Sequence, residues 1–222
     1  MNKRRLFVRL TMRRQLQIMA GCTLIALTYA LAMQWLIHTS VGFEYMFLTW
    51  SCAVPAIVMA LTADEGLQLG LTRRDLWGAS VVCSGIQGLL FAGINTVATL
   101  LLSALHIQAY GMVLFTFNNQ IWTSLLGGLL VGSLCGLIGV SAWFVLRYNI
   151  QWGAFAVMML MVLFPIVITV PGLLLASQLR RVSLAYVLGF MAIMFGLNVL
   201  VGLVNRRLFR DYQVQALLKK GR

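Results

Sequence analysis

Few residues in this chain could carry out acid–base chemistry, and no acidic residue or histidine lies at the centre of an apolar segment. Only five of the 222 residues are acidic and only two are histidines. Proton and ion relays inside membranes use buried carboxylates or histidines. The sequence therefore disfavours a proton-coupled transporter and an intramembrane aspartyl protease. The acidic residues are Glu44, Asp64, Glu65, Asp75 and Asp211.

No motif indicates a metal site or covalent catalysis. His38, His106 and Glu44 are expected on the same side of a membrane, but two interfacial histidines so far apart in sequence are more often incidental than metal ligands. HExxH, GxSxG and the lysine of a phosphate-binding loop are all absent from the sequence. We therefore expect no catalytic residue, no metal and no cofactor bound by this chain. The four cysteines fall inside apolar stretches and are interpreted as packing residues.

The elements that position these residues are predicted to be membrane-spanning helices. Hydrophobic residues make up 61% of the chain and charged residues 10%, whereas a soluble domain is about a quarter charged. A spanning helix needs about 20 mostly apolar residues. The sequence predicts an all-α, polytopic membrane protein of a single transmembrane domain, with about six spans and a basic tail at 206–222. The predicted spans are 16–37, 45–62, 76–105, 121–146, 152–176 and 182–205.

The basic residues predict the orientation of these spans. The net charge is +12, and of the 17 basic residues all but Arg180 and Arg181 fall at the two termini or in the loops after the second and fourth spans. By the positive-inside rule both termini are cytoplasmic. The charge is thus explained by topology and by anionic membrane lipid, so nucleic acid is not an expected partner.

Residues 1–15 are expected to form an amphipathic elbow helix at the membrane surface. Arg5, Arg9 and Arg13 recur four residues apart, and Leu6 and Leu10 lie on a neighbouring face. The alternative is a positively charged anchor that forms no helix.

The loop after the second span is the most informative segment. Thr62 with Glu65, and Thr72 with Asp75, have the spacing of capping boxes that begin helices. Gly66 and Gly70 would punctuate a short helical piece between the two starts. The sequence thus predicts a compact charged loop facing the cytoplasm, either because its acids cap helices or because they bind a partner. The candidate partner-binding residues are Asp64, Glu65, Gly70, Thr72, Arg73, Arg74 and Asp75.

Two further sets of residues lie within the spans. Ser124, Gly128, Gly132 and Gly136 recur at every fourth position and predict close packing against another helix, of this chain or of a second copy. Pro165 and Pro171 are expected to kink the fifth span, with or without a re-entrant gate. The polar residues within the spans line a possible substrate path or make interhelical hydrogen bonds; they are Gln34, Gln87, Asn95, Thr96, Thr99 and Asn198.

Two short stretches carry a resemblance to a known family. The segment Arg9–Gln15, RLTMRRQ, and the segment Leu69–Trp77, LGLTRRDLW, resemble the corresponding places in small bacterial ABC-2 type permeases. The resemblance implies an elbow helix before the first span and a coupling helix at residues 64–74 that docks on an ATP-binding subunit. Larger family members have a longer hairpin between spans five and six, and this chain departs from them there.

The functional hypothesis is a permease subunit of an ABC transporter, an exporter in a bacterial cell membrane. Its expected partners are an ATP-binding cassette subunit, which holds the ATP, and a second permease copy or paralogue. One alternative is a substrate-binding subunit of the energy-coupling-factor type, and a ligand retained by the purified subunit alone would favour it. Another alternative is a membrane protein of some other non-catalytic role. An enzyme acting on lipid would need a carboxylate or histidine cluster at one interface, and the sequence contains none.

Overall fold

The structure, a computed structural model, describes residues 3–37, 43–104, 121–148 and 184–211. These residues are helical apart from one short turn, as the composition predicts, and they contain no strand. The predicted fifth span, with Pro165 and Pro171, lies outside them. The helices are α1 (Lys3–Ile37), α2 (Phe43–Gln68), α3 (Arg73–Ala104), α4 (Ile121–Tyr148) and α6 (Leu184–Asp211).

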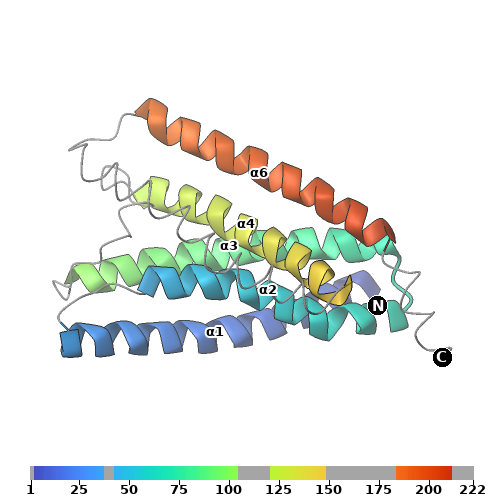
Figure 1. Cartoon of the computed structure of the whole chain (residues 1–222), viewed down its shortest axis with the longest axis horizontal. Coiled ribbons are helices and arrows are strands. Elements are labelled where there is room, and N and C mark those ends of the chain that lie inside the picture. Colours follow the sequence, from blue (N-terminus) through green and yellow to red (C-terminus); the bar gives the residue numbers. More distant parts are fainter. Residues whose placement is uncertain (1–2, 38–42, 105–120, 149–183, 212–222) are drawn as a thin grey trace.

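Helix α4 is the centre of the packing. It packs against α2, α3 and α6, while α1 packs against α2 and α3 on the opposite side (Figure 1). One buried cluster includes Met19, Val58, Phe91 and Leu134, and a second includes Phe144 and other residues near one end of the helices. The core therefore contains side chains from every described helix.

Three of the described helices are long and apolar enough to cross a membrane. They are the segments Arg73–Val97 of α3, Leu125–Arg147 of α4 and Val187–Arg210 of α6. Only 11% of the apolar window of the α6 segment is buried, and large side chains such as Phe195 and Leu200 are exposed. An apolar surface of this extent indicates a helical membrane protein. Six spans remain a prediction.

Helix α1 differs from the sequence-based expectation. Residues 3–15 do not form a separate elbow helix, because α1 continues without a break from Lys3 to Ile37. This stretch has no proline, and Arg, Leu, Met and Gln are good helix formers. Its 35 residues give a helix about 52 Å long at 1.5 Å per residue. The predicted interfacial segment is therefore the first turns of a long helix.

Candidate functional site at the charged end of the helices

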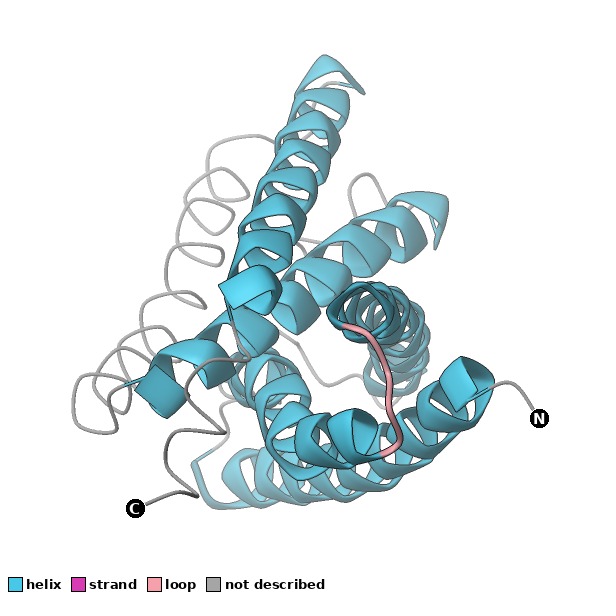
Figure 2. Ribbon diagram, turned by 90° about the vertical axis from the view of Figure 1, so that its right-hand side faces the viewer, coloured by secondary structure: helices cyan, strands magenta, loops and turns pink. Residues whose placement is uncertain are grey.

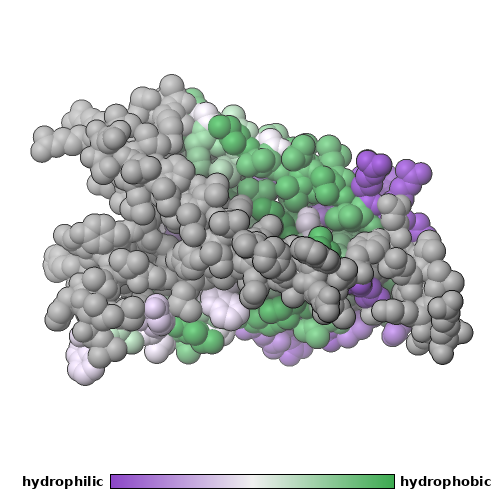
Figure 3. Space-filling view, in the orientation of Figure 1, coloured by the Kyte–Doolittle hydropathy of each residue, from purple (hydrophilic) through white to green (hydrophobic). Residues whose placement is uncertain are grey.

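The segments that bear most of the basic residues meet at one end of the molecule. The start of α1, the turn between α2 and α3, and the ends of α4 and α6 lie together at the right of Figure 1. Hydrophilic side chains gather at this end in Figure 3, next to the hydrophobic surface over α6. We call this the charged end, and the turn within it is the best-defined candidate site.

Glycine closes α2 at this turn. Gly70 has a φ of +74°, the left-handed conformation that glycine adopts without strain. The Leu71 amide donates to the Gly66 carbonyl at 3.1 Å, and the Gly70 amide donates to the Leu67 carbonyl at 2.9 Å. This pair of bonds is the Schellman arrangement that satisfies the last carbonyls of a helix. The helix therefore stops at a fixed point.

Helix α3 begins immediately afterwards. The Asp75 amide donates to the Thr72 hydroxyl at 3.2 Å, and the Thr72 amide donates to the Asp75 carboxylate at 3.3 Å. This is the reciprocal capping box that the spacing predicts. Only residues 69–72 separate the two helices, and they form the pink segment of Figure 2.

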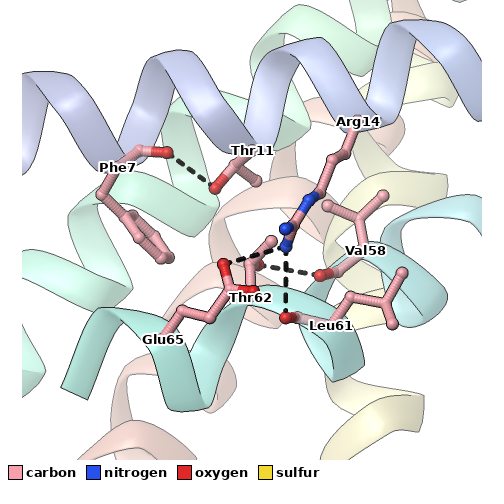
Figure 4. A network of polar contacts seen from close by, with 7 residues as sticks. All are labelled: Phe7, Thr11, Arg14, Val58, Leu61, Thr62 and Glu65. Carbon is pink, nitrogen blue, oxygen red and sulfur yellow. Dashed lines mark hydrogen bonds and ion pairs between the residues drawn. The ribbon is translucent and has the colours of Figure 1, made fainter. Parts of the chain in front are cut away.

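No separate coupling helix is present at residues 64–74. Residues 64–68 are the end of α2, and Arg73 and Arg74 are the start of α3. The Thr62–Glu65 pair was wrongly predicted to begin a helix, because the buried Thr62 hydroxyl donates back to the Val58 carbonyl at 2.8 Å (Figure 4). A hydroxyl bonded to its own preceding turn belongs to a helix interior.

The two caps make the turn sensitive to one methyl group. A Cβ atom on Gly70 would meet only the Lys3 Nζ at 3.6 Å, so space is available and the cost is conformational. We expect Gly70→Ala to lower the free energy of unfolding by about 1 to 2 kcal/mol. Gly85→Ala is the matched control, since its Cβ meets nothing within 4 Å and alanine favours a helix interior. Denaturant unfolding of the purified protein measures both, and equal midpoints would contradict the assignment.

Glu65 joins the turn to α1. The Arg14 guanidinium donates to the Glu65 carboxylate at 2.9 Å and to the Leu61 carbonyl at 3.3 Å (Figure 4). The two side chains are 35% and 45% exposed, and pairs this accessible contribute less than about 1 kcal/mol. The pair therefore orients α1 against the end of α2 more than it stabilises the fold. The side chain of Asp64 lies outside the described part of the chain.

Helix α6 is joined to the start of α3 by three contacts. The Arg73 guanidinium donates to the carbonyl of Arg210. The Trp77 indole donates to the Gly202 carbonyl at 3.1 Å, and the Arg206 guanidinium lies 5.5 Å from the centre of the same ring. The turn is thus connected to both α1 and α6. Arg74, next to it, is exposed.

Aromatic side chains pack beneath the turn. The Phe144 and Phe209 rings meet edge to face with centroids 4.7 Å apart, and Trp143 lies 4.6 Å from Phe144. Leu71 and Phe7 belong to the same buried cluster. The turn therefore rests on a close-packed layer that contains residues of every described helix.

The small-residue stripe of α4 faces α3 of the same chain. A Cβ added to Gly128 would lie 3.0 Å from the Ala92 Cα, and one added to Gly136 would lie 2.9 Å from the Ser84 Cα. Between them Gly132 faces Gly88. The backbones of α3 and α4 thus approach closely over two turns or more. The side chain of Ser124 lies outside the description.

Three of the polar residues predicted along a substrate path make separate contacts in the described part of the chain. Gln87 is fully buried and accepts a hydrogen bond from Gln15 at 2.6 Å, between α1 and α3. Asn198 of α6 donates to the Leu130 carbonyl of α4 at 2.9 Å, and the Thr96 hydroxyl donates to the preceding turn of its own helix. Asn95 is buried. The side chains of Gln34 and Thr99 are not among those described.

Several residues at the site were missed by sequence reasoning. Sequence reasoning used Arg14 as a topology signal and within the segment Arg9–Gln15, and it did not assign Arg14 a contact. Its position outside the row formed by Arg5, Arg9 and Arg13 could have singled it out. Asn205 is fully buried, where it donates to the Leu137 carbonyl at 2.8 Å and accepts from Ser141 at 2.7 Å. Its position seven residues after Asn198, two helical turns along the same apolar span, is the signal that could have found it.

The described residues contain no cluster of potential metal ligands and no disulfide. Among them no three potential ligands come together, and all four cysteines are buried free thiols. Comparison with protein-family models, characterised proteins and solved structures finds no match to this chain. The side-chain contacts at the charged end connect α1 to α2 and α3 to α6.

Proposed function

We propose that this chain is the membrane-spanning permease subunit of an ABC exporter in a bacterial cell membrane. In this proposal two permease subunits, identical or paralogous, work with two ATP-binding subunits. The ATP is bound and hydrolysed by the partner, and the charged end with its turn faces the cytoplasm. The remaining spans, including the predicted fifth, complete a six-span topology with both termini on the cytoplasmic side.

The observation that carries the proposal is the doubly capped turn between α2 and α3. Its geometry is fixed by the left-handed Gly70 and by the Thr72–Asp75 box. It is connected to α1 through Glu65 and to α6 through Arg73. A partner that pushed on a rigid turn of this kind would move several helices together, as a transport subunit driven by a separate ATPase requires. Flexible loops would absorb the same displacement.

The chemistry of the turn supports a protein partner of complementary charge. Arg74 is exposed beside the turn, and two acids next to it have partners in the described part of the chain, Asp75 with Thr72 and Glu65 with Arg14. Charged groups at an interface fix its register and partner choice. The proposal assigns this role to Arg74, with an acidic group on the ATP-binding subunit.

Charge reversal at Arg74 tests the proposal. We expect Arg74→Glu to fold normally, because the side chain is exposed, and to lower permease-stimulated ATP hydrolysis by at least about tenfold. Arg207→Glu is the control, since it makes the same charge change at an exposed position of the same end. Co-purification with the ATP-binding subunit and ATPase assays in membranes measure the effect.

Two outcomes would contradict the proposal. If Arg74→Glu binds and stimulates the ATPase as the wild type does, the turn is not the coupling contact. If the purified chain alone retains a small-molecule ligand and associates with no ATPase, the substrate-binding alternative is favoured. Reversal at Glu65 is a poorer test, because it also breaks the ion pair with Arg14.

A further inference from the structure

One face of α1 carries three arginines without a partner in the described part of the chain. Arg5, Arg9 and Arg13 are all exposed, and α1 contains no acidic residue. The nearest arginine with a carboxylate partner, Arg14, points to α2 and binds Glu65. Hydrophilic side chains follow the outer edge of α1 toward the charged end in Figure 3. This row of three cations, the arginine row, is available to bind an anion.

The direction of the row follows from helix geometry. At 100° per residue Arg5, Arg9 and Arg13 lie on the side opposite Phe7 and Thr11, which are buried. The row continues along the helix into the exposed side chains of Leu16, Leu24 and Leu31. The arginines therefore share one face with the surface that the predicted span at 16–37 presents to lipid.

The depth of the row follows from helix length. Arg13 is three residues from Leu16, a rise of about 4.5 Å, and each further arginine is about 6 Å along the axis. The headgroup layer on one side of a bilayer is about 5 to 8 Å thick. If Leu16 begins the hydrocarbon-facing part of α1, Arg13 lies at headgroup depth and Arg9, about 10.5 Å from Leu16 along the axis, lies just beyond the headgroup layer. Arg5, about 16.5 Å from Leu16, lies within about one Debye length of the outer edge of that layer.

We infer that the arginine row is a binding surface for the phosphate groups of anionic phospholipids. Guanidinium groups bind phosphate oxygens in a bidentate manner, and the cytoplasmic leaflet provides such groups at the depth of Arg13 and attracts the cations of Arg9 and Arg5 toward its surface. A soluble protein would have to enter the headgroup layer to reach Arg13. The inference depends on the predicted first span and is independent of the proposed transport function.

The test measures lipid preference of the purified full-length protein. In neutral detergent we expect tighter binding of phosphatidylglycerol than of phosphatidylcholine by about 100-fold, since each basic residue near an anionic surface contributes about fivefold. Native mass spectrometry with titrated lipid measures the preference. We expect 1 M NaCl to reduce it strongly, because the contacts are exposed to screening.

Substitutions of the three arginines test whether the arginine row causes the preference for the anionic lipid. Arg5→Gln, Arg9→Gln and Arg13→Gln combined should bind the two lipids equally, whereas the Lys triple at the same positions should keep most of the preference. The control removes exposed charges from another helix at the same end, Arg207→Gln and Arg210→Gln, and should lose less of the preference than the matching Arg9→Gln and Arg13→Gln double variant. The single Arg9→Gln variant, with an expected loss of about fivefold, serves if the triple variant does not accumulate.

Three results would overturn the inference. The wild type binding both lipids equally would remove its basis, and so would an unchanged preference in 1 M NaCl. An equal loss in the double variant of the row and the α6 control would mean that net charge, and not this face of α1, selects the lipid. None of these results depends on whether Arg74 contacts an ATP-binding subunit.

Discussion

Gly132→Leu is expected to prevent α4 from packing on α3 and to remove most of the folded protein. A Cβ at this position would lie 2.9 Å from the Gly88 Cα and 2.9 Å from the Phe91 Cγ. The first of these atoms is backbone and cannot turn aside, so the two helices must separate. Overpacking costs about 1 to 3 kcal/mol even where side chains can adjust, and we expect about 3 kcal/mol or more here. Protein domains are stable by only about 5 to 15 kcal/mol.

Gly93→Leu is the matched control on α3. A Cβ there would meet nothing within 4 Å, and leucine favours a helix interior over glycine by up to about 1 kcal/mol. The measurements are the yield of monodisperse protein in detergent and its unfolding midpoint. Wild-type yield and midpoint for Gly132→Leu would mean that the stripe is not a close helix contact. Gly132→Ala should give an intermediate loss.

Local features of the fold could be predicted from the sequence, and the reason is that they depend on neighbouring residues. The Thr72–Asp75 box was found by spacing, because both partners of each bond lie within one turn. The same spacing at Thr62 was misleading, because residues three apart are also neighbours inside a helix. The end of α2 is decided by the residue that can adopt a positive φ. That residue is Gly70, eight positions after Thr62.

Contacts between helices could not be predicted in the same way. Arg14 and Glu65 are 51 positions apart, and Gln15 and Gln87 are 72 apart. Their pairing depends on how α1 lies across α2 and α3, which spacing within α1 does not determine. The continuity of α1 was missed for a related reason. A change from basic to apolar composition marks where a helix enters a membrane, and it does not mark where the helix bends.

The position of the turn between α2 and α3 was predicted more accurately than its structure, and its binding of a partner stays a prediction. The predicted partner-binding set included Gly70, Thr72 and Arg73, and the structure places all three at the junction of α2 and α3. Their roles are different from those of a separate coupling helix, because two caps leave no residues for one. The contribution of α6 through Trp77 and Arg73 was not expected, since no sequence pattern relates residues more than 100 positions apart.

The second substitution with a large expected effect on stability lies in the aromatic layer beneath the turn. Phe144 has no exposed surface, and its ring meets Phe209 of α6 edge to face and lies next to Trp143. Trp143 in turn lies 5.8 Å beneath the Arg147 guanidinium. This layer holds the charged end of α6 against α4, where Asn205 also bonds to Leu137.

Phe144→Ala is expected to lower the free energy of unfolding by about 3 to 5 kcal/mol, because the cavity it leaves is enclosed by helices that cannot all move inward. Phe195→Ala is the matched control. It removes the same atoms from an α6 side chain that is 62% exposed, so we expect a change within about 1 kcal/mol. Denaturant titrations of both variants in one detergent give the comparison. Similar losses in the two variants would show that the aromatic layer does not hold α6.

If the proposed function is correct, Phe144→Ala at permissive temperature should also weaken the stimulation of ATP hydrolysis while leaving the partner bound. The reason is that the turn keeps its own hydrogen bonds but loses the aromatic packing beneath it.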